Sequence, residues 1–259
     1  LVYCVQAGAW DRLGDFASGL VTSARDPRLL AALVPHLQTA AESAPAGQRR
    51  WCCLSYLADA LKNGGRPDAS LPFFEQAATQ ARADAEAGGD DAQQAWGHLA
   101  VITGNWAIAL VMNGELDAAR QRKLDSAEAE RQAGRPAIHV IASELEALRI
   151  DIMQGEVAAA LPAVETRLAQ IEAWWQRHSA GQRVPEAPDA EILARAFIAA
   201  FDIATDAHFA QEDWPAALCR IDAILAVKRA LQRPAEDIAA ARMNRAVVLC
   251  RMHRFGEAW

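Results

Sequence analysis

The chain lacks the residue patterns that mark common enzyme and metal-protein classes. Its 259 residues contain no G-x-x-x-x-G-K-[ST] loop for a nucleotide phosphate and no His-Glu-x-x-His zinc motif. No serine or cysteine sits in a recognisable nucleophile elbow. Asp202, Asp206 and His208 are close in sequence, but residues 206 and 208 project from different sides of a helix, which disfavours a metal site. We therefore expect no catalytic residues, no metal and no cofactor.

Cysteine is sparse and carries no paired motif. None of the five cysteines forms a C-x-x-C pair, and no secretory signal is visible. The adjacent Cys52 and Cys53 point to different sides of a helix and make a poor metal chelate. We expect reduced thiols and a cytoplasmic location, with a redox pair at these two residues as the alternative.

Positive charge and long apolar runs are also in short supply. Lys and Arg total 26 against 33 Asp and Glu, for a formal net charge of −7. Phosphate contact needs a clustered positive surface, so this balance argues against a general nucleic-acid partner. No uninterrupted apolar run approaches the roughly 18 residues that span a bilayer. We expect neither a nucleic-acid partner nor a membrane.

What the chain has in abundance is alanine and helical periodicity. Apolar residues recur at spacings of three and four nearly everywhere, and no segment alternates apolar and polar β-branched residues as a strand does. Asp26-Pro27 supplies a capping side chain and a first-turn proline. The pattern predicts an all-α fold with helices at 2–7, 9–24, 27–43, 47–63, 67–87, 90–113, 116–133, 135–154, 157–179, 188–211, 213–231 and 234–252.

A short turn phrase repeats along the chain and predicts stacked helical hairpins. Asn63-Gly64-Gly65 is echoed by Asn113-Gly114, by Gln154-Gly155 and more loosely by Gln211-Glu212-Asp213. Each copy is expected to join two antiparallel helices. A last copy begins at His253, and the helix expected after it is absent. The sequence therefore reads as a fragment of a longer polypeptide whose last repeat is truncated.

The hairpins resemble the tetratricopeptide repeat (TPR). The family places bulky and small residues at fixed offsets around the turn, as do the residues Leu54, Leu57, Ala58, Leu61, Ser70, Phe74 and Ala77. Small residues allow two helices to cross closely, and large ones fill the adjacent gaps. The resemblance implies a right-handed α-solenoid, with TPR-like repeats over 48–259 and a degenerate helical unit at 1–47.

The resemblance implies a non-catalytic scaffold that binds a protein or peptide along the concave face. The first helix of each hairpin lines that face, and the residues mapped to it are Asp59, Lys62, Asn105, Ile108, Asp202, Asp206 and Asn244. Asn105 and Asn244 occupy an offset where family members often grip a ligand backbone; ordinary solvated polar residues are the alternative. Val101, Ile108 and Val111 form an apolar strip that holds a partner helix or packs on a neighbouring repeat.

Two other functions and association between copies of the chain are further hypotheses. The chain is similar to long-helix repeats attached to bacterial STAND-type signalling ATPases, which makes it a candidate sensor or regulatory segment. An enzyme or metal protein built in the helical groove is the third and least favoured hypothesis. An uncovered apolar face at 234–259 also predicts self-association through that end, because terminal repeats normally need capping.

Overall fold

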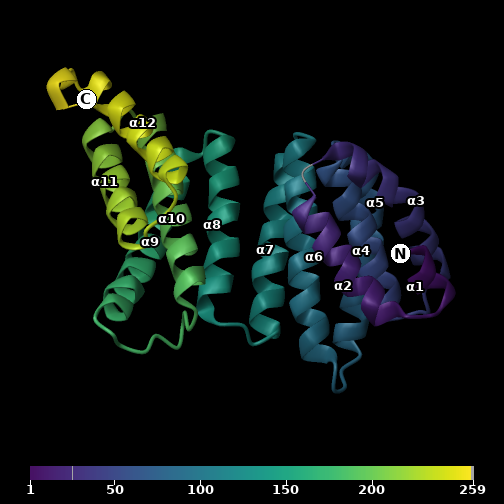
Figure 1. The fold of residues 1–259 in the computed structure, drawn as a ribbon. Coiled ribbons are helices and arrows are strands. Elements are labelled where there is room, and N and C mark those ends of the chain that lie inside the picture. The colour runs from purple at the N-terminus through teal and green to yellow at the C-terminus, as the bar shows by residue number, and fades with distance from the viewer. Residues whose placement is uncertain (25, 258–259) are drawn as a thin grey trace. The chain divides into compact units, whose positions relative to one another are not determined.

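The computed structural model describes residues 1–24 and 26–257, apart from the side chain of Thr22. The described residues form twelve α-helices and one short 3-10 helix, with no strand, which confirms the all-α helical repeat fold (Figure 1). Each predicted helix begins and ends within two residues of the observed one. The helices group into two compact units, Leu1–Arg135 (unit 1) and Pro136–Trp259 (unit 2).

Unit 1 is a set of antiparallel helices in which successive helices pack side by side. Its last five helices pair in order, and α2 also packs on α4. The bounds are α1 (Val2–Gln6), α2 (Trp10–Ser23), α3 (Pro27–Ser43), α4 (Gln48–Asn63), α5 (Pro67–Glu86), α6 (Ala92–Met112) and α7 (Leu116–Gln132).

Unit 2 repeats this arrangement with fewer helices. Helix α10 is its centre, because it packs against α8, α9 and α11. The bounds are α8 (Ala137–Met153), α9 (Val157–Ser179), α10 (Ala190–Ala210), α11 (Trp214–Ala230), α12 (Ala235–Arg251) and the 3-10 helix η1 (Phe255–Glu257). The predicted division at residue 47 concerns repeat type rather than compactness, so it stays a prediction.

The turn phrases act as helix terminators with one shared hydrogen-bond geometry. At the α6–α7 turn Gly114 has φ +79°, and the N–H of Glu115 donates to the carbonyl of Leu110 over 2.9 Å. At the α10–α11 turn Glu212 takes the left-handed conformation, and the Asp213 N–H donates to His208 in the same way. This pairing satisfies a carbonyl that the end of a helix leaves without a partner. The turns therefore stop each helix and reverse the chain.

The residues that carry the TPR resemblance lie in the core of unit 1. Every member of the set is buried: Leu54, Leu57, Ala58, Leu61, Ser70, Phe74 and Ala77. The Ser70 hydroxyl donates to the carbonyl of Pro67 over 2.6 Å, so the polar atom is satisfied at the helix crossing. Alanine at these crossings lets α4 and α5 approach closely. The pattern of bulky and small residues in the sequence therefore corresponds to the packing of α4 against α5.

Helix α6 bears on the expectation that the chain has no membrane partner. It is long and apolar enough by length and mean hydropathy to cross a bilayer, although its apolar residues are interrupted by Gly104, Asn105 and other polar or small residues. Half of the apolar stretch of α6 is buried inside the structure, and the helix packs against both α5 and α7. A core helix meets the same length and hydropathy test, so this feature is weak evidence for a membrane span.

The long linker between α9 and α10 is part of the core of unit 2. Val184 and Ala187 are buried in it, and the Glu186 carbonyl accepts a hydrogen bond from the N–H of Ile138 over 3.0 Å. Arg177 near the end of α9 donates to the Glu186 carboxylate and to the Arg183 carbonyl. The linker thereby joins the starts of α8 and α10 to the end of α9.

Candidate functional site

Three of the predicted site residues meet in unit 1. The Lys62 ammonium donates to Asp59 Oδ1 over 2.7 Å, and Asn105 Nδ2 on α6 donates to Asp59 Oδ2 over 3.1 Å. Burial raises the pKa of the Asp59 carboxyl, and the bonds from Lys62 and Asn105 oppose that rise. A residue pair 46 positions apart in sequence is thus joined through one carboxylate.

Lys62 corrects the expectation of a solvent-facing cation. Its side chain is only 7% exposed and its Nζ atom lies 5.7 Å from the centre of the Phe74 ring. The lysine sits in the last turn of α4, where its long stem folds over Phe74 and its charge meets Asp59. Lys62 therefore holds Asp59 in place and does not itself face a ligand.

Asp59 and Asn105 lie at one end of a trough in unit 1, which is lined mainly by α2, α4 and α6, the first helices of its hairpins. A pocket of about 570 Å³ lies between α2, the α3–α4 turn and α4. A second pocket of about 270 Å³ continues toward α6 and is lined by Asp59 and Asn105. Cys52, Tyr56 and His98 line both pockets, so the two form one trough. Sequence reasoning identified Asp59 and Asn105 at one end but missed these three shared residues.

The shared residues are neutral at ordinary pH. Burial raises the pKa of the Cys52 thiol to about 12, with a smaller effect of Cys53, and raises that of the Tyr56 phenol to about 12. Burial and the Arg135 charge lower the pKa of His98. Thiol chemistry needs the thiolate, so these values do not favour a redox role for Cys52 and Cys53. The trough can bind by shape, hydrogen bonds and aromatic contact.

An apolar strip borders the trough on α6. Val101 is 53% exposed, Ile108 42% and Met112 52%, and they lie on the same helix face as Asn105 because they follow its spacing of three and four. Val111, which was expected in this strip, is only partly exposed. Such a strip is the kind of surface on which an amphipathic partner segment can lie.

The predicted residues of unit 2 are solvent-exposed and less connected. Asp202 and Asp206 are one turn apart on α10, and Asp206 Oδ2 lies 4.0 Å from Arg149 on α8. Burial among the surrounding helices raises the pKa of both carboxyls, even though each side chain still reaches solvent. Asn244 is exposed on α12. None of the described pockets is lined by these three residues.

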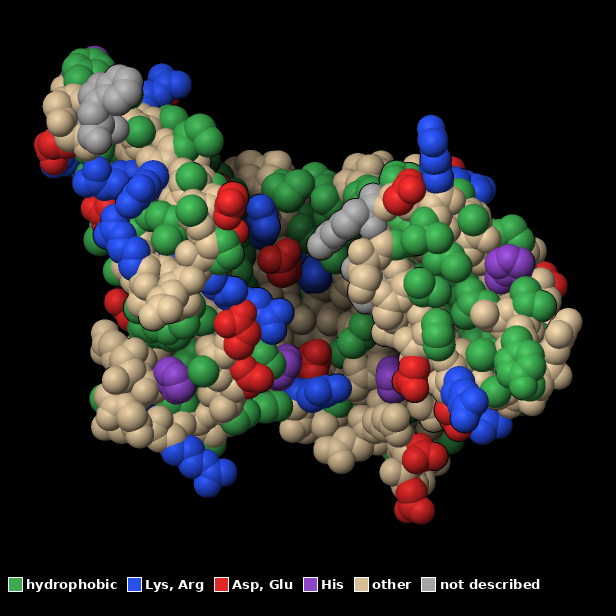
Figure 2. Space-filling model, viewed as in Figure 1, with side chains coloured by type: hydrophobic (Ala, Val, Ile, Leu, Met, Phe, Trp, Pro, Cys, Tyr) green, Lys and Arg blue, Asp and Glu red, His purple; other side chains and the backbone are tan. Residues whose placement is uncertain are grey.

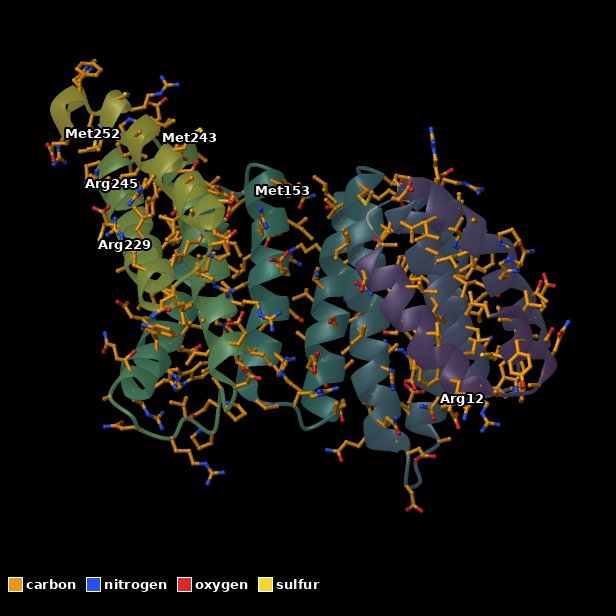
Figure 3. The ribbon with its side chains drawn as sticks, viewed as in Figure 1. Arg12, Met153, Arg229, Met243, Arg245 and Met252 are labelled. Carbon is orange, nitrogen blue, oxygen red and sulfur yellow. The ribbon has the colours of Figure 1, made fainter. Side chains whose placement is uncertain are left out.

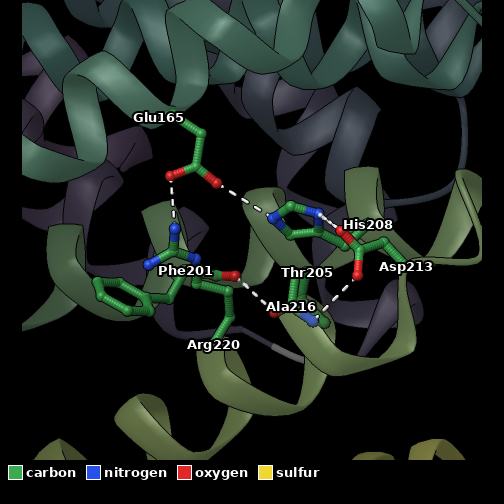
Figure 4. Close-up of polar contacts among 7 residues, drawn as sticks. All are labelled: Glu165, Phe201, Thr205, His208, Asp213, Ala216 and Arg220. Carbon is green, nitrogen blue, oxygen red and sulfur yellow. Dashed lines mark hydrogen bonds and ion pairs between the residues drawn. The ribbon is translucent and has the colours of Figure 1, made fainter.

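A buried polar cluster in unit 2 was missed by sequence reasoning (Figure 4). The Glu165 carboxylate on α9 bridges His208 Nε2 at 3.1 Å and Arg220 Nη2 at 2.6 Å. His208 is buried, its Nδ1 lies 3.7 Å from Asp213, and the Arg220 guanidinium lies 5.6 Å from the Phe201 ring centre. The cluster joins α9, α10 and α11 and opens to no described pocket, which indicates a packing role. No spacing within one helix could have revealed it.

No metal site accompanies these clusters in the described residues. Across 1–24 and 26–257, no group of three or more His, Cys, Asp or Glu side chains is placed to hold a metal ion. The cysteines at 4, 52, 53, 219 and 250 are all free thiols.

Comparison with known proteins identifies the fold. No family model matches the sequence, and no curated protein matches it. A single-substitution variant of a candidate kinesin light chain from Podosopora anserina, with nearly identical TPR-like repeats, is 17% identical to this chain. It matches with a TM-score of 0.56 over 89% of this chain and 98% of that one. BtubC from P. vanneervenii is 18% identical, with a TM-score of 0.55 over 86% and 92%.

The chain therefore has a TPR-like fold. That fold is commonly used for protein–protein interaction scaffolds. At these identities the likeness concerns the fold alone. The relation to STAND-type signalling proteins stays a prediction.

Proposed function

We propose that this chain is a non-catalytic module that binds a peptide or protein segment in the trough of unit 1. The observation that carries the proposal is the pair of pockets that share Cys52 and Tyr56 on α4 and His98 on α6. The pockets are lined by α2, α4 and α6, the first helices of three successive hairpins. The exposed strip on α6 extends the surface available to a segment. Asn105 contributes an amide oxygen that can accept from a peptide N–H while its Nδ2 is held by Asp59.

Selection of a displayed peptide library on the purified chain tests this function. Selected peptides should lose affinity when Gly14→Leu fills the larger pocket and when Asn105→Ala removes the amide. Gln121→Ala, on an exposed position of α7 outside both pockets, should leave affinity unchanged. Asp202→Ala asks whether unit 2 contributes. Peptides that bind all four variants as well as the parent chain would show that neither the trough nor Asp202 is the binding site.

A second proposal concerns association between copies through α12. Met243 and Val247 are 66% and 46% exposed on this helix, and Phe255 beyond it is 56% exposed. Figure 3 shows Met243 and Arg245 on α12 and Arg229 on α11. Figure 2 shows Lys and Arg side chains gathered over the same two helices. Two such faces repel through charge while their apolar residues attract, so added salt should favour association.

Light scattering at rising protein and salt concentration tests this association. The parent chain should shift toward a dimer, and Met243→Glu should keep it monomeric. Met153→Glu, at a residue 54% exposed on α8, is the control. A monomer at every concentration and salt level would contradict the proposal.

A cytoplasmic location completes the proposal and is supported by the five free thiols. Fractionation of cells that express the tagged natural protein tests it.

A further inference from the structure

Gly14 on α2 lines the larger pocket of the trough. A Cβ added to Gly14 would lie 3.8 Å from the Tyr56 hydroxyl, at ordinary contact distance, so an alanine fits while a longer side chain enters the pocket. Gly14 is partly buried and its helix neighbours Leu13 and Asp15 also line the pocket. Glycine within a helix costs about 0.5–1 kcal/mol relative to alanine.

The charges around this pocket do not balance. Asp11 and Asp15 on α2 line it, and Arg49 on α4 is the one lysine or arginine among its lining residues. The Arg49–Asp11 pair is 3.9 Å apart with side chains 53% and 92% exposed, so it is weak. Within the described part of the chain, Asp15 has no ion-pair partner. Asp15 is exposed at the pocket rim, and burial, with smaller effects of Cys52, Cys53, Asp15 and Asp59, raises the pKa of the Tyr56 phenol that lines the same pocket.

The other polar groups of the trough do not offset this negative charge. Asp59, at the far end, is already matched by Lys62. Burial lowers the pKa of His98, which therefore contributes no positive charge at neutral pH. Trp10 and Tyr56 supply aromatic walls to the same pocket. A carboxylate without a partner beside aromatic rings is a favourable setting for a cation, since ring faces attract positive charge.

We propose that the larger pocket binds a cationic side chain, lysine or arginine, of a peptide segment lying in the trough, with Asp15, Trp10 and Tyr56 as its contacts. This inference rests on the proposed function and specifies its ligand. Asp15 supplies the counter-charge, and the rings supply the walls along which an apolar stem lies. Arg49 opposes binding, because it is a like charge at the rim. The two rim residues thus have opposite effects on affinity.

The test uses peptides selected on the purified chain and resynthesised in matched forms. Each arginine is replaced by citrulline, which has nearly the same shape and no charge, and each lysine by norleucine. Affinity should fall about tenfold for the neutral form of the residue that enters the pocket. On the protein side, Asp15→Asn should weaken binding of the cationic peptide about fivefold, and Arg49→Gln should strengthen it by a similar factor. Neither substitution should change binding of the citrulline peptide.

The two glycines of α2 separate failure of this inference from failure of the proposed function. Gly14→Leu should abolish binding, while Gly14→Ala and Gly19→Leu should not, because a Cβ at Gly19 meets open space. Peptides that need an open pocket at Gly14 but are neutral or acidic would overturn the cationic ligand and leave the trough as the site. Peptides that bind Gly14→Leu normally would overturn both.

Discussion

The two units close equivalent turns with different residues. Of the nine glycines with positive φ, seven lie in unit 1 and two, Gly155 and Gly181, in unit 2. Within residues 1–24 and 26–257, the three non-glycine residues in that conformation are all in unit 2: Glu212, Gln232 and His253. The α6–α7 turn and the α10–α11 turn close with the same backbone bond, whereas the connections at Gly47, Gly88 and Gly89 lack it. Unit 2 therefore closes such turns without glycine and tolerates a left-handed strain of about 1–2 kcal/mol per residue.

The units also differ in how they bury polar groups. Unit 1 encloses a lysine against one carboxylate, with Asn105 as the other donor. Unit 2 shares Glu165 between the buried His208 and Arg220, and both Glu165 and Arg220 keep some exposure to water. A buried ion pair is costly when one member is lost, whereas a shared, partly exposed one keeps a second partner. Unit 1 should therefore depend more on its pair than unit 2 does on its cluster.

The largest expected effect is at Asp59. Asp59→Ala leaves the Lys62 ammonium buried without its counter-charge and should lower the free energy of unfolding of unit 1 by about 3 kcal/mol. Hydrogen exchange of α4 and α6 measures this, with α10 in unit 2 as the internal reference. Adding Lys62→Met to Asp59→Ala should recover part of the loss. A double variant less stable than Asp59→Ala would show that the pair is not the cause.

The corresponding change in unit 2 should be smaller. Glu165→Ala removes the contacts to both His208 and Arg220 and should lower the stability of unit 2 by about 2 kcal/mol. Arg220 keeps some access to water, which limits the loss. Gln170→Ala, at an exposed position on the same helix, is the control. An effect in unit 2 equal to that of Asp59→Ala in unit 1 would break the comparison.

High pH should destabilise unit 1 through its thiols. Burial raises the folded-state pKa values of Cys52 and Cys53 to about 12 and about 11, above the ordinary thiol value of 9.0. The stability these thiols contribute is fully present below 9.0, falls as pH rises past 9.0, and is lost once pH has passed the folded values. Between pH 8 and pH 10 the loss from the two thiols together should be about 2–3 kcal/mol. A Cys52→Ala/Cys53→Ala chain should show a smaller fall over the same range, and an equal fall would assign the effect to other groups.

The smallest expected effect is a gain in the stability of unit 2. Glu212→Gly relieves the left-handed strain at the α10–α11 turn and should raise stability by about 0.5–1 kcal/mol, after the larger chain entropy of glycine is subtracted. Thermal unfolding followed by circular dichroism measures it. In unit 1, the reverse change Gly114→Glu should destabilise the equivalent turn. If both changes have the same sign, the turns are not equivalent.

Local features of the sequence predicted the helices closely. Asp26 accepts from the Arg28 N–H over 2.9 Å, and Pro27 occupies the first turn of α3, as the sequence indicates. The Asn113-Gly114 turn in the sequence likewise predicted the end of α6, which the structure places at Met112. These signals act over a few residues, so they are visible in the chain itself.

The candidate site was only partly visible from the sequence. Mapping the first helix of each hairpin to the concave face placed Asp59 and Asn105 there, but it also read Lys62 as exposed, and the structure buries that lysine. The trough itself depends on Gly14 facing Tyr56, which are on different hairpins. Such a cavity follows from helix packing and has no counterpart in residue spacing.

The sequence by itself determined where helices start and stop, and which small and large residues meet at their crossings, because both depend on neighbours within one or two turns. Only the tertiary structure decided which polar side chains became buried and paired. Asp59 with Asn105 and Glu165 with His208 are joined across 46 and 43 residues. Whether such a charge is solvated or enclosed depends on helices brought together by the fold, and that environment sets its energy.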